Sequence, residues 1–115
     1  MKINSFEDVI SWQKARVLNK AIYTSFNGCK DYSFRDQIQR ASVSIMNNIA
    51  EGFERETKPE LIRFLFISKG SCGEVKSMII LAHDLGYLTK QQLVEYAALT
   101  TEISKLLYGL IKSLK

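Results

Sequence analysis

Positively charged and aromatic side chains alternate near the N-terminus in a pattern suited to nucleic-acid binding. Trp12, Arg16 and Lys20 recur every four residues, which places them in one row of a helix, and Tyr23 lies close to that row. Cations bind phosphates, whereas aromatic rings stack on unpaired bases. The predicted nucleic-acid-binding residues are Trp12, Arg16, Lys20, Tyr23, Lys30, Arg35 and Arg40. The alternative is an ordinary solvated helix face, with Trp12 and Tyr23 packed against a neighbouring helix.

The glutamates and the histidine, which often take part in catalysis, lack the partners that they would need here. Glu51, Glu54 and Glu56 surround Arg55, yet no nucleophile or metal ligand is near them in sequence, so we interpret them as an ion-paired helix end. His83 is the single histidine and lacks the Glu-x-x-His spacing of a metal site in a helical bundle. The sequence therefore predicts a protein that is not an enzyme and that holds no metal or cofactor.

Cysteine usage and hydropathy indicate a cytosolic protein. The two cysteines, Cys29 and Cys72, form no CxxC motif and have too few histidines for a zinc site, so we expect structural thiols. Uninterrupted apolar runs such as 64–67 and 78–82 are short, whereas a membrane-spanning helix needs about 20 apolar residues. Glu7 and Asp8 precede any apolar stretch, unlike in a signal peptide. We therefore expect a cytoplasmic location.

Two further clusters of polar residues are interpreted as structural. Asn47, Asn48 and Glu51 lie one helical turn apart, and we expect part of this group to meet another helix, with Arg40 or Arg63 as the partner of Glu51. A second cluster of cations lies near the C-terminus, where it complements the negative end of a helix dipole. Its members are Lys105, Lys112 and Lys115.

The composition is that of one folded domain spanning residues 1–115. Of its 115 residues, 46% are hydrophobic and 24% are charged, and there are only one proline and six glycines. These values exclude collagen-like and broadly disordered chains, and the formal net charge of +4 is too modest to identify a partner.

Helix-start signals divide the chain into four helical segments. In each signal a hydroxyl residue precedes an acid or amide by three positions, and it can accept from an otherwise unpaired amide of the first turn. The pairs are Ser5/Asp8, Ser33/Asp36, Thr57/Glu60 and Thr89/Gln92. Gly86 follows Leu85, where a left-handed residue would stop a helix. The sequence predicts helices near 6–26, 34–55, 58–85 and 90–114.

Apolar residues in the last three segments recur at alternating steps of three and four. This spacing is typical of helices that pack nearly parallel to one another. The predicted seams are Ile38, Ser42, Ile45, Ile49 and Gly52; Leu61, Leu65, Ser68, Cys72, Val75, Ile79 and Ala82; and Leu93, Ala97, Thr100, Ser104, Leu107, Ile111 and Leu114. With short loops, these seams predict an all-α fold, an antiparallel up-down-up-down four-helix bundle.

A second apolar stripe lies on the third and fourth segments, and one bundle cannot bury both stripes. We therefore expect a homo-oligomer, while a monomer with a wide core-facing arc is the alternative. The predicted oligomer interface consists of Ile62, Phe66, Gly73, Ile80, Leu99 and Leu106. A glycine inside a helix costs about 1 kcal/mol relative to alanine, a loss that close approach of another helix would offset.

The sequence also resembles a known family. The segment QIQRASVSIMNNIAEG at 37–52, with Arg55, Glu60, Arg63-Phe64-Leu65, Gly70-Ser71 and Glu74, resembles the proteins encoded within intervening sequences of bacterial 23S ribosomal RNA genes. The similarity extends from Phe6 through Leu88 and weakens in the last helix. This family is also similar to the accessory variability proteins of diversity-generating retroelements.

The resemblance implies a ring-like homopentamer of four-helix bundles without enzymatic activity. It also implies a basic surface that binds nucleic acid and, in retroelement members, a reverse transcriptase partner. Arg40 matches the second basic residue of the family's Gln-Ile-Arg-Arg pattern, whereas Gln39 replaces the first and removes one phosphate contact. Asn27 stands where the family usually has proline.

The sequence thus predicts a non-catalytic, homo-oligomeric accessory protein that binds structured or single-stranded nucleic acid. The alternative function is a scaffold for protein interactions that binds no nucleic acid.

Overall fold

The computed structural model describes residues 3–115, which form helices joined by short loops. A single 3₁₀ turn, η1 (Phe6–Asp8), precedes four long helices: α1 (Ile10–Ser25), α2 (Tyr32–Phe53), α3 (Lys58–Asp84) and α4 (Lys90–Leu114). No strand occurs among the described residues. The prediction of an all-α fold with four helices is therefore confirmed.

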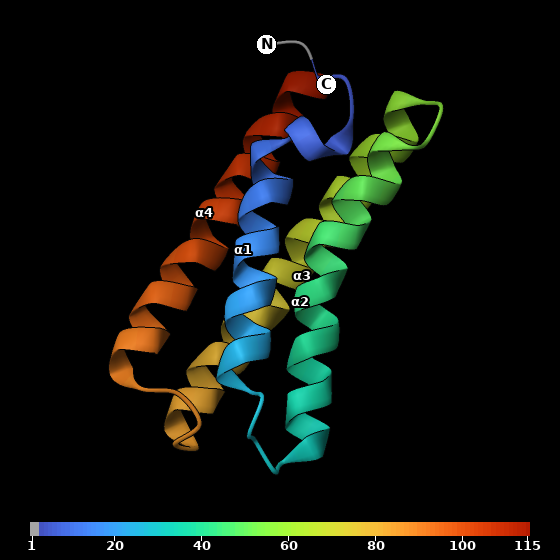
Figure 1. Ribbon diagram of the computed structural model, residues 1–115. Coiled ribbons are helices and arrows are strands. Elements are labelled where there is room, and N and C mark those ends of the chain that lie inside the picture. The colour runs from blue at the N-terminus through green and yellow to red at the C-terminus, as the bar shows by residue number, and fades with distance from the viewer. Residues whose placement is uncertain (1–2) are drawn as a thin grey trace.

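The four helices pack side by side in a body of 43 × 22 × 19 Å. α2 packs beside α1 and α3, and α4 packs beside α3 and α1, whereas the Cα atoms of the two diagonal pairs of helices stay more than 8 Å apart. Figure 1 shows the α1–α2 and α3–α4 loops at one end of the body and the α2–α3 loop at the other. The C-terminal part of α1 therefore lies beside the N-terminal part of α2, where the predicted cations gather.

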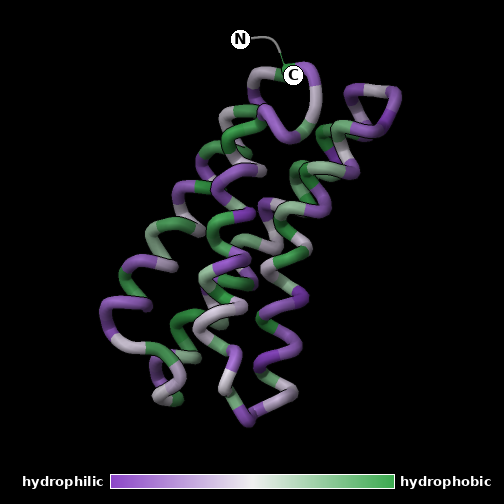
Figure 2. Tube along the Cα trace, in the orientation of Figure 1, coloured by the Kyte–Doolittle hydropathy of each residue, from purple (hydrophilic) through white to green (hydrophobic). Residues whose placement is uncertain are grey.

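The core lies where the predicted seams meet. Every seam residue predicted in α2 is buried, as are all those in α3 except the half-buried Leu61. In α4 the seam prediction missed Tyr96 and Ile103, both of which are buried. Figure 2 shows hydrophobic and hydrophilic residues alternating along each long helix, as expected when one face packs inward.

Buried polar side chains link neighbouring helices across the core. The Asn19 side-chain amide of α1 donates to the carbonyl oxygens of Ala15 and Ser42, at 2.9 and 3.0 Å. Ser68 Oγ of α3 donates to the Ile45 carbonyl of α2 at 2.7 Å. Because a buried polar group is costly without a partner, these bonds favour one register between the helices.

The predicted caps of α3 and α4 are confirmed. Thr57 Oγ1 accepts from the Glu60 amide, and Thr89 forms a full capping box with Gln92. At the end of α3, Gly86 has a φ of +80°, the left-handed conformation in which only glycine avoids strain. The Tyr87 amide then donates to the Ala82 carbonyl at 2.8 Å. The left-handed conformation of Gly86 and this hydrogen bond together end the helix.

The predicted start of the first helix is wrong. Ser5 makes no side-chain cap, and Val9, in an extended conformation with ψ of 122°, separates the turn Phe6–Asp8 from α1. Val9 is buried, and the Phe6 ring packs against the Trp12 ring at a centroid distance of 5.1 Å. The turn folds back onto α1 because this buries Val9 and packs Phe6 against Trp12. A helix that continued from Phe6 into α1 could not make these contacts.

The predicted cap of the second helix is also wrong. Asp31, not Ser33, caps α2: its Oδ1 accepts from the Phe34 amide at 3.2 Å. Its other oxygen, Oδ2, accepts from the Tyr87 hydroxyl at 2.7 Å. This hydrogen bond joins the α1–α2 loop to the α3–α4 loop, so a contact distant in sequence favours Asp31 over the nearby serine.

Gly52 lies where α2 packs tightly against α3. A Cβ atom at this position would lie 3.0 Å from Phe64 Cβ and 3.0 Å from Leu61 Cδ1. At Gly109 of α4, nothing lies within 4 Å of the same added atom. Gly52 therefore has a packing role, and Gly109 does not.

Gly52→Ala is expected to lower the free energy of unfolding by about 1 to 3 kcal/mol, because Phe64 Cβ moves only with the α3 backbone. Gly109→Ala, the matched control, is expected to raise it by about 0.5 to 1 kcal/mol through helix propensity. Urea denaturation at one protein concentration measures both values. If Gly52→Ala stabilised the protein as much as the control, close packing at Gly52 would be refuted.

Candidate nucleic-acid interface

The row of cations on α1 is exposed to solvent. Arg16 and Lys20 are both exposed, and the Arg16 guanidinium lies 5.9 Å from the centre of the Trp12 ring. Trp12 itself is half-buried against Phe6. The Trp12 ring therefore contributes to the fold as well as to this surface, as the alternative interpretation of the sequence allowed.

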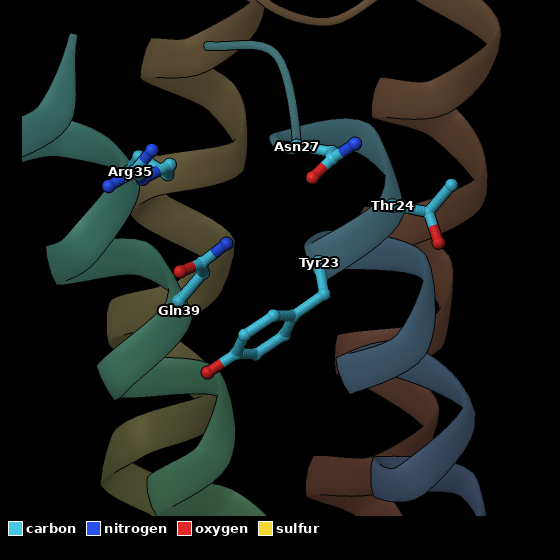
Figure 3. A pocket seen from close by; sticks show the side chains of 5 residues that line it. All are labelled: Tyr23, Thr24, Asn27, Arg35 and Gln39. Atoms are coloured by element: carbon cyan, nitrogen blue, oxygen red, sulfur yellow. The ribbon is translucent and has the colours of Figure 1, made fainter. Parts of the chain in front are cut away.

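Tyr23 lies where α1 and α2 face each other. It lines an open cavity of about 420 Å³ together with Thr24, Asn27, Arg35 and Gln39. Figure 3 shows the Tyr23 ring extending from α1 toward α2, with Arg35 and Gln39 on the α2 side. The structure thus brings together two predicted binding residues, Tyr23 and Arg35, that are distant in sequence.

A second open cavity of about 570 Å³ also includes Tyr23 and Gln39 in its lining. Arg40 and Asn47 of α2 line it as well. Tyr23, Arg35 and Arg40 are therefore parts of one surface, which we call the α1–α2 groove. Its lining residues are Tyr23, Thr24, Asn27, Arg35, Asp36, Gln39, Arg40, Val43, Ser44, Asn47 and Asn48. Arg16 and Lys20 lie on α1 outside this lining, within two helical turns of Tyr23.

Arg35 is held by two neighbours at the edge of the groove. Its guanidinium lies 4.8 Å from the centre of the Tyr32 ring, and its Nε and Nη2 atoms each lie 3.2 Å from Asp36 Oδ1. The Arg35 side chain is 29% exposed and that of Asp36 is 56% exposed. An ion pair this open to solvent contributes about 1 kcal/mol, so a phosphate can displace Asp36 from Arg35 at little cost. Sequence reasoning missed Tyr32, which is exposed at the first position of α2.

Asp31 places a negative charge next to Lys30, which is exposed in the α1–α2 loop. The hydrogen bond from Tyr87 lowers the pKa of Asp31, and the Phe34 amide lowers it further. The same hydrogen bond raises the pKa of Tyr87. Asp31 therefore stays ionised and Tyr87 stays neutral at neutral pH, so this pair reduces the positive potential around Lys30.

The expected polar group on α2 has different partners from those predicted. Asn48 donates to the carbonyl and to the hydroxyl of Ser44, and the Ser44 hydroxyl lies 3.0 Å from that of Ser71 on α3. Glu51 pairs with Arg55 at 2.6 Å, so the predicted pairing with Arg40 or Arg63 is wrong. The reason is that Arg55 lies one turn away on the same helix face.

The two cysteines and the single histidine belong to no metal-binding cluster of the described residues. Cys29 and Cys72 are both free, and burial raises the pKa of the Cys72 thiol to about 12. His83 Nδ1 lies 4.0 Å from the Asp84 carboxylate. Within residues 3–115, no group of three or more acidic, histidine or cysteine side chains is placed to hold a metal ion. No helix in this range combines the length and hydropathy that crossing a membrane requires.

The predicted oligomer interface is partly exposed on the single chain. Phe66 and Ile80 of α3 are 44% and 47% exposed, and nothing lies within 4 Å of a Cβ atom added at Gly73. Ile62 and Leu99 instead pack against the core of their own chain. Leu106 is half-buried and lines a cavity of about 370 Å³.

The lysines near the C-terminus contact aromatic rings. Lys112 Nζ lies 5.6 Å from the centre of the Tyr108 ring, and Lys115 Nζ lies 5.3 Å from that of Phe66. Lys69 approaches Tyr108 from α3 at 6.0 Å. Sequence reasoning assigned Lys112 and Lys115 only to the helix dipole. It missed the contacts of Lys69 with Tyr108 and of Lys115 with Phe66 because these depend on how α3 and α4 pack. The contact of Lys112 with Tyr108 lies within α4, one helical turn apart.

Comparisons with known proteins agree with this fold. No curated protein matches the chain. A crystal structure from Bacteroides thetaiotaomicron, described as a protein of unknown function from the S23 ribosomal protein family, matches with a TM-score of 0.83 and 27% identity. The match covers 89% of this chain and 98% of that one. A family model described as 23S rRNA-intervening sequence protein matches residues 7–109, so the chain belongs to this family.

Proposed function

We propose that this protein is a non-catalytic accessory protein that binds single-stranded or structured nucleic acid as a homo-oligomer. In this proposal, cytoplasmic up-down-up-down bundles assemble into a ring, a homopentamer as the sequence resemblance implies. The nucleic-acid surface comprises the exposed row of Arg16 and Lys20 together with the α1–α2 groove.

The observation that carries the proposal is that cations and aromatic rings alternate on one exposed surface. Tyr23, Arg35 and Arg40 line adjoining cavities of the α1–α2 groove, and Arg16 and Lys20 are exposed on the same helix as Tyr23. A single strand presents phosphates and unpaired bases together, and these two kinds of side chain match those two kinds of group.

Assembly supports binding by repeating a weak site. One chain has a formal net charge of +4 and can contact few phosphates. A ring presents the same surface several times to one long strand, which raises the effective concentration of each site. The exposed Phe66 and Ile80 supply the apolar area for this assembly.

Titration of labelled single-stranded and hairpin RNA with the protein, at several salt concentrations, tests the proposed function. The logarithm of the association constant is expected to fall linearly with the logarithm of the salt concentration, by about 0.7 to 0.9 for each phosphate contacted. No binding of either RNA at low salt would contradict it.

The second candidate function is a scaffold for protein interactions, with a reverse transcriptase as one such partner. It is favoured by the exposed apolar side chains of α3, which could receive a partner helix instead of another copy of the chain. A monomer that binds no RNA would favour this second function.

A further inference from the structure

The 420 Å³ cavity of the α1–α2 groove has walls of distinct chemistry. Tyr23 and Asn27 line it from the last turn of α1 and the residues that follow, and Arg35 and Gln39 line it from the first two turns of α2. Figure 3 shows the aromatic ring and the two side-chain amides around one open space. The cavity therefore combines a flat apolar surface, neutral hydrogen-bonding groups and a cation.

The two side-chain amides of this cavity are free to bind a ligand. Tyr23 is 46% exposed, and the side-chain amides of Asn27 and Gln39 make no hydrogen bond to any residue that the structure describes. An amide offers both donors and an acceptor, so it can pair with the edge of a nucleobase. Tyr32, on which the Arg35 guanidinium lies, adds a second exposed ring close by.

We propose that this cavity binds one unstacked nucleobase of a single strand. Tyr23 stacks on the base, and Gln39 and Asn27 form hydrogen bonds with its edge. Arg35 binds the adjacent phosphate, and Arg40, in the adjoining cavity, binds the next one. The proposal rests on the proposed function and adds the class of ligand to it.

An unpaired base fits this cavity better than a duplex does. The cavity is a recess between two helices, whereas the bases of a duplex are stacked with their faces covered. A strand must therefore turn a base out of its stack to reach the Tyr23 ring. An acidic peptide would use Arg35 and Arg40, but it would leave the ring and the two amides without a matching partner.

Comparison of two single-stranded DNA probes of equal length separates base recognition from phosphate binding. One probe is an intact strand, and the other has abasic sites throughout, so it carries the same phosphates without bases. The wild-type protein is expected to bind the intact strand about 5- to 100-fold more tightly, because one stacked base contributes about that factor. Tyr23→Ala is expected to remove this preference, and Tyr23→Phe, which retains the ring, is expected to keep it.

Tyr108→Ala is the matched control, since Tyr108 is a similarly exposed tyrosine on α4. It is expected to retain the preference for the intact strand, and circular dichroism shows whether each variant keeps its helices. Equal binding of the two probes by the wild type, or an unchanged preference in Tyr23→Ala, would overturn the base site and leave the proposed function standing. Binding of neither probe at low salt would overturn the base site, and the same result with the single-stranded and hairpin RNAs would overturn the proposed function as well.

Discussion

The protein carrying Phe66→Glu is expected to have the mass of one chain, 13.1 kDa, whereas the unchanged protein is expected to have the mass of an oligomer. Phe66 is 44% exposed on α3, and Ile80 and Leu81 are exposed on the same helix. Burial of several hundred Å² of such surface contributes about 25 cal/mol per Å², enough to drive association. A carboxylate in the interface would lose its hydration, at a cost of several kcal/mol.

The fold of the single chain is expected to survive Phe66→Glu. The side chain is not part of the buried core, and Lys115 Nζ lies 5.3 Å from the ring, close enough to pair with a carboxylate. Val17→Glu is the matched control, since Val17 is 59% exposed on α1. Light scattering at micromolar concentration measures the masses. An oligomeric mass for the Phe66 variant, or a single-chain mass for the unchanged protein, would refute the interface.

The double substitution Arg16→Glu and Lys20→Glu is expected to weaken RNA binding by about tenfold or more at low salt. Both side chains are exposed one helical turn apart on α1. Each reversal would remove a cation and place an anion next to the proposed strand, and the proposed ring would repeat this loss in every chain. The salt dependence is expected to become flatter by about 0.7 to 0.9 for each phosphate contact that is lost.

The matched control for this substitution is Lys58→Glu with Lys76→Glu, which changes the net charge equally at two exposed positions of α3. It is expected to bind RNA more tightly than the α1 variant does, and light scattering must give the same mass for both. If the α1 variant bound as tightly as the unchanged protein, the site would lie elsewhere. The lysines around Tyr108 and Phe66 would then be the next candidates.

The number of helices and their core positions could be predicted because they depend on local patterns. The seam of α2, from Ile38 to Gly52, repeats at helical spacing and is buried throughout. The caps of α3 and α4 were predictable for the same reason, since Thr57 and Thr89 each have a partner three residues later. The start of α2 was not predictable in this way, because the Tyr87 hydroxyl, distant in sequence, contacts Asp31.

The candidate site could be predicted only in part. The cations and Tyr23 were found from residue type and spacing, but the cavity between Asn27 and Gln39 depends on how closely α1 and α2 pack. In the sequence, Gln39 was notable only as a replacement for a basic residue. Tyr32 was missed because it precedes the expected start of the second helix, although the Arg35 guanidinium lies over its ring. Packing between α1 and α2, which a one-dimensional pattern does not encode, forms the cavity, whereas the contact between Tyr32 and Arg35 lies within the first turn of α2.

The mass of the complex formed by the unchanged protein and a single-stranded RNA tests the central claim most directly. Native mass spectrometry at low salt is expected to detect one RNA strand bound to several copies of the 13.1 kDa chain, because the claim requires both assembly and binding. Detection of the RNA and the protein only as separate species at low salt would contradict it.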